Sequence, residues 1–126
     1  MSNYKQDILN YGDDVKNLDC SPYEQLRMVN DRTEIQKNID KLTNSEITLL
    51  RMFDLMLLNN VEEMLNHISN VYDFTLSDKN NIPYTYWWWH LDKIVKGDLV
   101  VGSDVSPKRN QVKTEVFNSN ELIEGN

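Results

Sequence analysis

The sequence predicts a mainly α-helical domain that ends in a small β-hairpin. Two capping boxes mark helix starts, because Ser21 and Thr43 are each followed by glutamate three residues later. Apolar residues then recur at spacings of three and four, the period of one helix face. Toward the C-terminus the pattern becomes strict alternation over residues 111–117, which is typical of a strand.

The size and composition are those of one globular domain. The chain has 126 residues, 40% of them hydrophobic and 26% charged, enough to bury a core without metals or disulfides. The longest apolar run, residues 47–58, is too short to span a membrane and is interrupted by Arg51 and Asp54. The single cysteine, Cys20, forms no internal disulfide and is interpreted as an incidental thiol rather than a redox sensor. With no secretory signal at the N-terminus, we expect a cytoplasmic protein.

The negative charge is concentrated in the N-terminal part of the chain. The total is −7; residues 1–75 hold 13 acidic and 7 basic side chains, giving −6, whereas residues 76–117 hold 5 acidic and 6 basic ones, giving +1. This balance argues against a uniformly basic surface for nucleic acid. A nucleic-acid contact, if there is one, is expected after residue 75.

We expect four main helices. They follow a short helix over residues 4–11. The first main helix runs from Pro22 to about Leu42, and the second, a central core helix that is apolar around most of its circumference, starts after Thr43. A third main helix covers residues 61–71, and polar residues 73–81 predict a loop. The spacing of Tyr84, Trp87, Trp88, Leu91, Ile94 and Val95 predicts the last helix, over residues 84–96. A strand over residues 82–88 is the alternative, since aromatic residues favour strands, but it leaves residues 91–95 unexplained.

The expected hairpin joins residues 99–101 to residues 111–117, with a long tip that carries Lys108, Arg109 and Asn110. Residues 118–126 are polar, and we expect a flexible tail there. The chain thus reads as a single domain, with residues 1–42 as an N-terminal helical extension, residues 43–117 as the core and residues 118–126 as the tail.

Residue patterns for catalysis or metal binding are missing. The two histidines, His67 and His90, have no nucleophile or third ligand nearby in the sequence, and the Glu63 and His67 pair is interpreted as a solvated helix face. The four glycines are isolated, so no phosphate-binding loop is predicted. We therefore expect a binding protein that is not an enzyme and has no cofactor or metal.

Helices followed by a hairpin are the order of elements in a winged helix-turn-helix. Residues 45–50 (SEITLL), 61–65 (VEEML) and 90–100 (HLDKIVKGDLV) resemble winged-helix regulators of the MarR and SarA type. The resemblance covers about residues 43–117. It implies a winged helix-turn-helix preceded by a long N-terminal helix that serves dimerisation. It also implies that the protein is a homodimeric transcriptional regulator that binds double-stranded DNA.

By this resemblance the helix over residues 84–96 is the recognition helix and the hairpin tip is the wing. The implied DNA contacts on the helix are Thr85, Tyr86, Trp89, His90, Lys93 and Lys96. Those on the wing are Lys108, Arg109 and Asn110. Lysines suit phosphate contacts, hydroxyl groups donate to the backbone, and a wing arginine suits the minor groove.

The alternative function is binding to another protein. Three consecutive tryptophans cannot all point inward on a helix, because successive residues differ by about 100°. Trp89 is then exposed beside Tyr86 and could anchor a protein partner. With the charge of −7, this pattern also fits an acidic inhibitor or anti-host factor of a phage or other mobile element.

Overall fold

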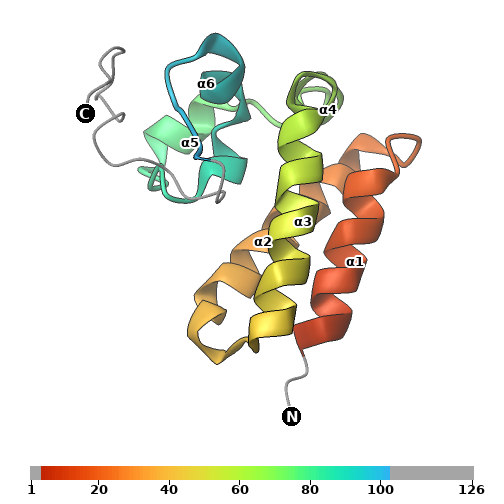
Figure 1. Cartoon of the computed structure of the whole chain (residues 1–126). Coiled ribbons are helices and arrows are strands. Elements are labelled where there is room, and N and C mark those ends of the chain that lie inside the picture. Colours follow the sequence, from red (N-terminus) through yellow and green to blue (C-terminus); the bar gives the residue numbers. More distant parts are fainter. Residues whose placement is uncertain (1–3, 103–126) are drawn as a thin grey trace. The chain divides into compact units, whose positions relative to one another are not determined.

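The computed structural model describes residues 4–102, and the chain divides into two compact units between Tyr72 and Asp73. The first unit holds most of the described helices, and its helices α1, α2 and α3 run side by side (Figure 1). The second unit begins with short helical segments. Each unit is described separately below.

Within residues 4–72, the first unit holds five helical segments, and capping residues fix where α2 and α3 begin. The five segments are α1 (Tyr4–Lys16), α2 (Pro22–Lys37), the 3-10 helix η1 (Ile39–Lys41), α3 (Asn44–Asn59) and α4 (Val61–Ile68). Ser21 and Thr43 both form complete capping boxes, in which each hydroxyl accepts the backbone N–H of Glu24 or Glu46. Both predicted helix starts are confirmed. The last turn before Thr43 tightens into η1, so α2 ends earlier than the predicted residue 42.

A buried polar cluster lies in the middle of the apolar core of this unit. Arg32 of α2 donates two hydrogen bonds to the carboxylate of Asp54 on α3, each 2.9 Å long. The hydroxyl of Tyr11 on α1 donates to Oδ1 of the same carboxylate at 2.5 Å. Asp54 is 1% exposed and Arg32 is 4% exposed, so both charges are out of water. One carboxylate therefore ties together three helices.

Burial keeps the tyrosine of this cluster protonated. Burial first, and then the Asp54 carboxylate, raise the pKa of Tyr11 well above its ordinary value. The protonated hydroxyl is the form that can donate a hydrogen bond, so the Asp54 carboxylate keeps its third donor at neutral pH. The buried apolar side chains of the first unit are Ile8, Val15, Met28, Val29, Ile35, Leu42, Leu50, Phe53, Leu57, Met64 and Ile68.

A second buried side chain closes the turn between α1 and α2. Gln25, which is fully buried, donates through Nε2 to the carbonyl oxygens of Asp14 and Asn17 at 2.7 and 3.0 Å. These carbonyls lie at the C-terminal end of α1 and just beyond it, where no intrahelical donor remains. Nε2 also lies 2.9 Å from Sγ of Cys20. Gln25, in the first turns of α2, therefore binds the C-terminal end of α1 through these hydrogen bonds.

The second unit contains α5 (Thr75–Lys79), the 3-10 helix η2 (Trp87–Trp89) and α6 (Leu91–Lys96). Its buried apolar side chains are Phe74, Trp87, Trp88, Leu91 and Leu99. The rings of Trp87 and Trp88 meet edge to face with centroids 5.4 Å apart, and Tyr86 stacks on Trp88 at 5.2 Å. Aromatic packing thus supplies most of the core of this small unit.

The predicted β-hairpin, and with it the winged helix-turn-helix, is wrong. Residues 4–102 are mainly helical and contain no strand. Gly97 takes the left-handed conformation (φ 84°) at the end of α6, and the amides of Asp98 and Leu99 both donate to the Lys93 carbonyl. The Leu99 amide, the first of the predicted strand 99–101, is thus used to close the helix, and Val101 takes part in no more than an isolated bridge. The second predicted strand, residues 111–117, lies outside the described residues.

Two other predictions in this region are also wrong. The polar loop expected at residues 73–81 contains α5, whose first turn follows an Asp73 side chain that accepts the Thr75 amide at 2.9 Å. The single helix expected over residues 84–96 is two segments, η2 and α6, separated at His90. His90 has φ −131° and ψ 39°, which are not helical values. The aromatic residues therefore belong to a turn and a 3-10 helix.

Gly12 allows α1 to approach α3 closely, which gives a test of this packing. A Cβ added at Gly12 would overlap the ring of Phe53. We expect Gly12→Ala to cost about 1–3 kcal/mol of overpacking, offset by up to about 1 kcal/mol of gained helix propensity. The net effect is a lower urea midpoint of unfolding. Lys5→Ala, at an exposed position of the same helix, is the control and should leave the midpoint nearly unchanged. A Gly12→Ala midpoint equal to or higher than that of the wild type would contradict the close approach of α1 to α3.

Candidate functional site

The residues predicted to contact DNA do not form one basic surface in the described part of the chain. Thr85 and Lys96 are exposed, whereas Tyr86 and Trp89 are half-buried. His90 is fully buried. The predicted wing residues Lys108, Arg109 and Asn110 lie outside the described residues.

Lys93 is held by carboxylates of its own unit. Its Nζ lies 2.8 Å from Oδ2 of Asp78 and 3.4 Å from both carboxylate oxygens of Asp92, and its side chain is 13% exposed. Burial alone lowers the pKa of Lys93, but these two carboxylates outweigh it and raise the pKa. Contacting a phosphate would require breaking this pairing. Of the two lysines in residues 84–96, Lys96 is therefore the exposed one.

His90 is likewise used inside the second unit. Its Nε2 lies 2.8 Å from the carbonyl oxygen of Ile82, and the ring of Tyr84 meets it edge to face at 4.6 Å. The imidazole therefore joins the start of the aromatic turn to the start of α6. It is a structural group here, with no surface toward a base or phosphate.

A different surface, which we call the α3 strip, is exposed on the first unit. It consists of Thr48, Met52, Leu55 and Asn59, with Arg51 at its edge, all of them exposed. Met52 is 45% exposed and Leu55 is 46% exposed, although both belong to a helix whose opposite side forms the core. Residues at these spacings share one side of a helix. Within residues 4–102, the α3 strip is therefore an exposed surface whose centre, Met52 and Leu55, is apolar and whose edge carries the cation Arg51.

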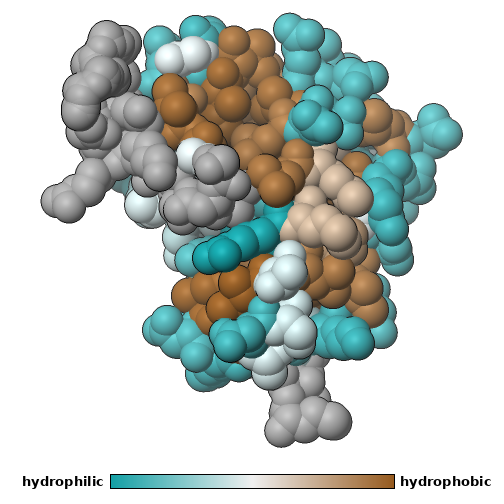
Figure 2. Space-filling view, viewed as in Figure 1, coloured by the Kyte–Doolittle hydropathy of each residue, from teal (hydrophilic) through white to brown (hydrophobic). Residues whose placement is uncertain are grey.

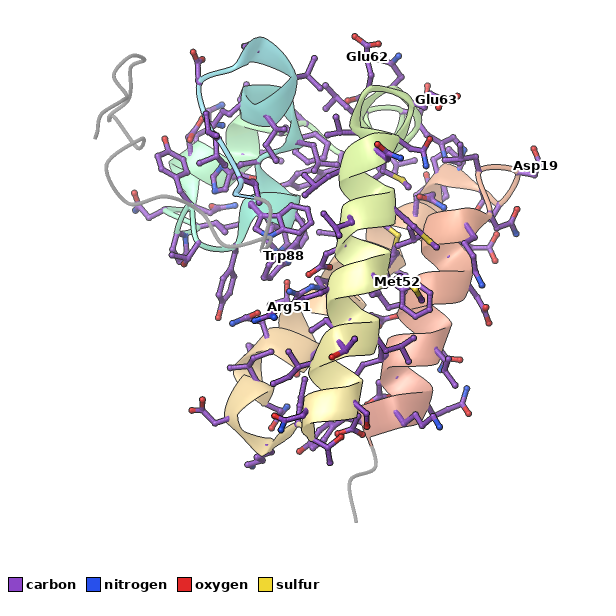
Figure 3. The ribbon with its side chains drawn as sticks, in the orientation of Figure 1. Asp19, Arg51, Met52, Glu62, Glu63 and Trp88 are labelled. Carbon is purple, nitrogen blue, oxygen red and sulfur yellow. The ribbon has the colours of Figure 1, made fainter. Side chains whose placement is uncertain are left out.

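The figures place this surface at the middle of α3. Arg51 and Met52 project from neighbouring positions of the helix (Figure 3). In the space-filling view a hydrophilic band crosses apolar surface at this level (Figure 2). The strip thus offers apolar contact area next to a positive charge.

The acidic residues of α3 do not neutralise the strip. Glu46 is buried in the capping box of Thr43, and Asp54 is buried in the Arg32 pair. No ion pair to Arg51 occurs within residues 4–102. The first unit as a whole is acidic, because residues 4–72 hold 12 acidic and 7 basic side chains, a net −5. The α3 strip therefore combines an apolar centre with a positive charge, on a unit whose net charge is negative.

An acidic groove lies between α1 and α2, with a cavity of about 350 Å³. Asp7, Asp31 and Glu34 line it together with amide side chains. Burial first raises the pKa of Asp31, Arg27 lowers it, and the carboxylates of Asp14, Asp7 and Glu34 raise it further, with a net upward shift. The groove therefore carries unfavourable like-charge contacts.

Glu63 and His67 line a shallow hollow beside α4 with Leu18, Asn66 and Asn70. Within residues 4–102, no three histidine, cysteine, aspartate or glutamate side chains come together as metal ligands would. No helix of that stretch is long and apolar enough to cross a membrane.

Comparison with known proteins gave no relative. The chain matches no protein-family model, no curated protein and no solved structure. The similarity to MarR and SarA regulators therefore rests only on residues 45–50, 61–65 and 90–100, and residues 4–102 contain no strand of the hairpin that it implied.

Sequence reasoning missed the α3 strip. The helix was predicted to be central because apolar residues surround it, yet a bundle of three helices covers only one side of each. The signal was present in that excess of apolar residues. A helix with apolar residues on every side needs a partner on every side.

The acidic groove yields a prediction with a defined pH dependence. Because the folded-state pKa of Asp31 is raised above its unfolded value of about 3.9, the ionised carboxylate destabilises the fold at neutral pH. Asp31→Asn should raise the free energy of unfolding at pH 7 by less than about 1 kcal/mol. The gain should vanish below about pH 3, where the wild-type carboxyl is protonated in both states. Urea unfolding at both pH values measures the change in free energy of unfolding, with the exposed Asp19→Asn as control. A lower free energy of unfolding for Asp31→Asn at pH 7 would contradict the prediction.

Proposed function

We propose that this protein works by binding another protein through the α3 strip. The observation that carries the proposal is the exposure of Met52 and Leu55, at 45% and 46%, on consecutive turns of a core helix. Burying such a side chain completely is worth about 1.5–3 kcal/mol, and about half of each remains to be buried. Two neighbouring, half-exposed apolar side chains of this kind suit a contact with the surface of another protein.

The charge on the strip favours a different protein over a second copy of this chain. In a two-fold symmetric contact the same surface lies on both sides. Two α3 strips facing each other would bring Arg51 near its own symmetry mate, and α3 has no exposed carboxylate to pair with it. A partner that presents an apolar side chain beside an aspartate or glutamate matches the strip better.

DNA is less well supported as the ligand. Lys93 is paired with Asp78 at 2.8 Å and His90 is fully buried, so two of the predicted contacts serve the fold. The first unit carries a net charge of −5, which repels a polyanion. An acidic protein that blocks a surface of another protein, such as an inhibitor, is the function that these features support.

Substitutions on α3 test the proposal against a matched control. A partner is first isolated with the full-length chain from the source cells, and a complex of fixed stoichiometry is then rebuilt from the two purified proteins. Leu55→Asp should weaken binding at least tenfold because it places a charge in the apolar contact, and Arg51→Glu should weaken it by charge reversal. Tyr23→Asp, which alters a side chain that is 72% exposed on α2, should leave affinity unchanged. Isothermal titration calorimetry measures all four proteins.

Three outcomes would overturn the proposal. The first is equal affinity of the partner for wild type and both α3 variants. The second is dimerisation of the chain alone, measured by sedimentation, that Leu55→Asp abolishes. The third is salt-dependent binding to duplex DNA at low ionic strength that the α3 variants retain.

A further inference from the structure

His90 is a buried titratable group that the proposed binding surface does not use. It lies between η2 and α6 in the second unit and is 0% exposed. Of its two ring nitrogens, Nε2 lies 2.8 Å from the Ile82 carbonyl oxygen, and Nδ1 is buried with no hydrogen-bond partner. The two nitrogens therefore have very different surroundings.

These surroundings fix the tautomer and oppose a second proton. A carbonyl oxygen only accepts hydrogen bonds, so Nε2 must carry the hydrogen and Nδ1 is the bare nitrogen. A proton added to the ring would sit on Nδ1, as a buried donor without an acceptor. The new positive charge would also be out of water.

The charged groups that face the ring come from α5 and α6. Lys93 opposes a positive charge on His90, whereas Asp78 and Asp92 favour one, and both carboxylates already pair with Lys93. Burial is the largest effect, and the net result is a lowered pKa for His90. The ring of Tyr84 covers another side at 4.6 Å. Because both carboxylates are already paired with Lys93, neither is left to form an ion pair with a protonated His90 ring.

We propose that the second unit is a proton-sensitive latch, which keeps residues 82–91 folded while the His90 ring is neutral and releases them when the ring is protonated. The Ile82 to His90 bond closes a segment that contains the aromatic turn and η2. Trp87 and Trp88 are each 1% exposed in the closed state. Opening would present both indole rings to solvent, and with them an apolar surface that is absent at neutral pH.

The direction and size of the effect follow from proton linkage. Because the neutral ring is favoured in the closed state, the contribution of His90 to stability is complete above the ordinary value of about 6.5 and is lost as pH falls below it. One proton changes the equilibrium constant for opening by up to about tenfold per pH unit. Histidine is the side chain whose ordinary pKa lies between pH 7 and 5, so this range reports mainly on histidine protonation.

The tryptophans provide a signal that belongs to this segment alone. All three tryptophans of the chain are residues 87–89. Urea titrations of the full-length protein, followed by tryptophan emission between pH 7.5 and 5, should show opening at lower urea as pH falls. His90→Gln keeps a donor for the Ile82 carbonyl but does not titrate, and its emission midpoint should be independent of pH. His67→Gln removes the other histidine and should behave as wild type.

Equal pH dependence in wild type and His90→Gln would overturn the proposal, as would a transition that disappears in His67→Gln. If His90→Gln does not fold, nitrogen NMR of the wild-type ring decides. The expected spectrum has hydrogen on Nε2 at pH 7 and a second proton only as the tryptophan emission changes. A ring that is protonated near pH 6.5 with unchanged emission would overturn the latch.

Discussion

The first unit depends on one buried ion pair, Arg32 with Asp54, and on the Tyr11 hydroxyl that completes it. The pair joins α2 to α3 by two bonds of 2.9 Å, and Tyr11 adds α1. Removing two charges from water is costly, and loss of one partner leaves the other buried and unpaired, at about 3–5 kcal/mol. A shift of any one of the three helices by a turn would break the cluster. The pair therefore selects one alignment of the helices, which the apolar contacts alone would select less sharply.

The same pair determines which side of α3 faces outward. With Asp54 held toward Arg32, the side with Leu50, Phe53 and Leu57 forms the core. Since successive residues are about 100° apart, Met52 and Leu55 then lie on the opposite side. The alignment of the helices and the exposure of the α3 strip thus have one cause. Arg51 at the edge of that side has no acidic neighbour on α3, because Glu46 bonds in the capping box and Asp54 pairs with Arg32.

Local signals in the sequence predicted local structure. The capping boxes at Ser21 and Thr43 gave the starts of α2 and α3. Hydrogen bonds that depart from a regular helix or strand pattern overturned the rest. The Lys93 carbonyl accepts the Leu99 amide, and His90 bonds to Ile82 across the aromatic turn. Helical spacing alone could not reveal a break at one residue. The excess of apolar residues on α3 indicated an exposed apolar side, but not which side, because that depends on a partner of Asp54 that lies 22 residues earlier.

The most direct test of this account is a double-mutant cycle on the pair, with Arg32→Met, Asp54→Leu and the double variant measured by urea unfolding at pH 7. Each single variant should lose about 3–5 kcal/mol, because it leaves one buried charge without its counter-ion. The double variant, which buries two apolar side chains instead, should lose far less than the sum, so that the coupling is several kcal/mol. Losses that simply add would contradict the account, since the two side chains would then stabilise the bundle independently.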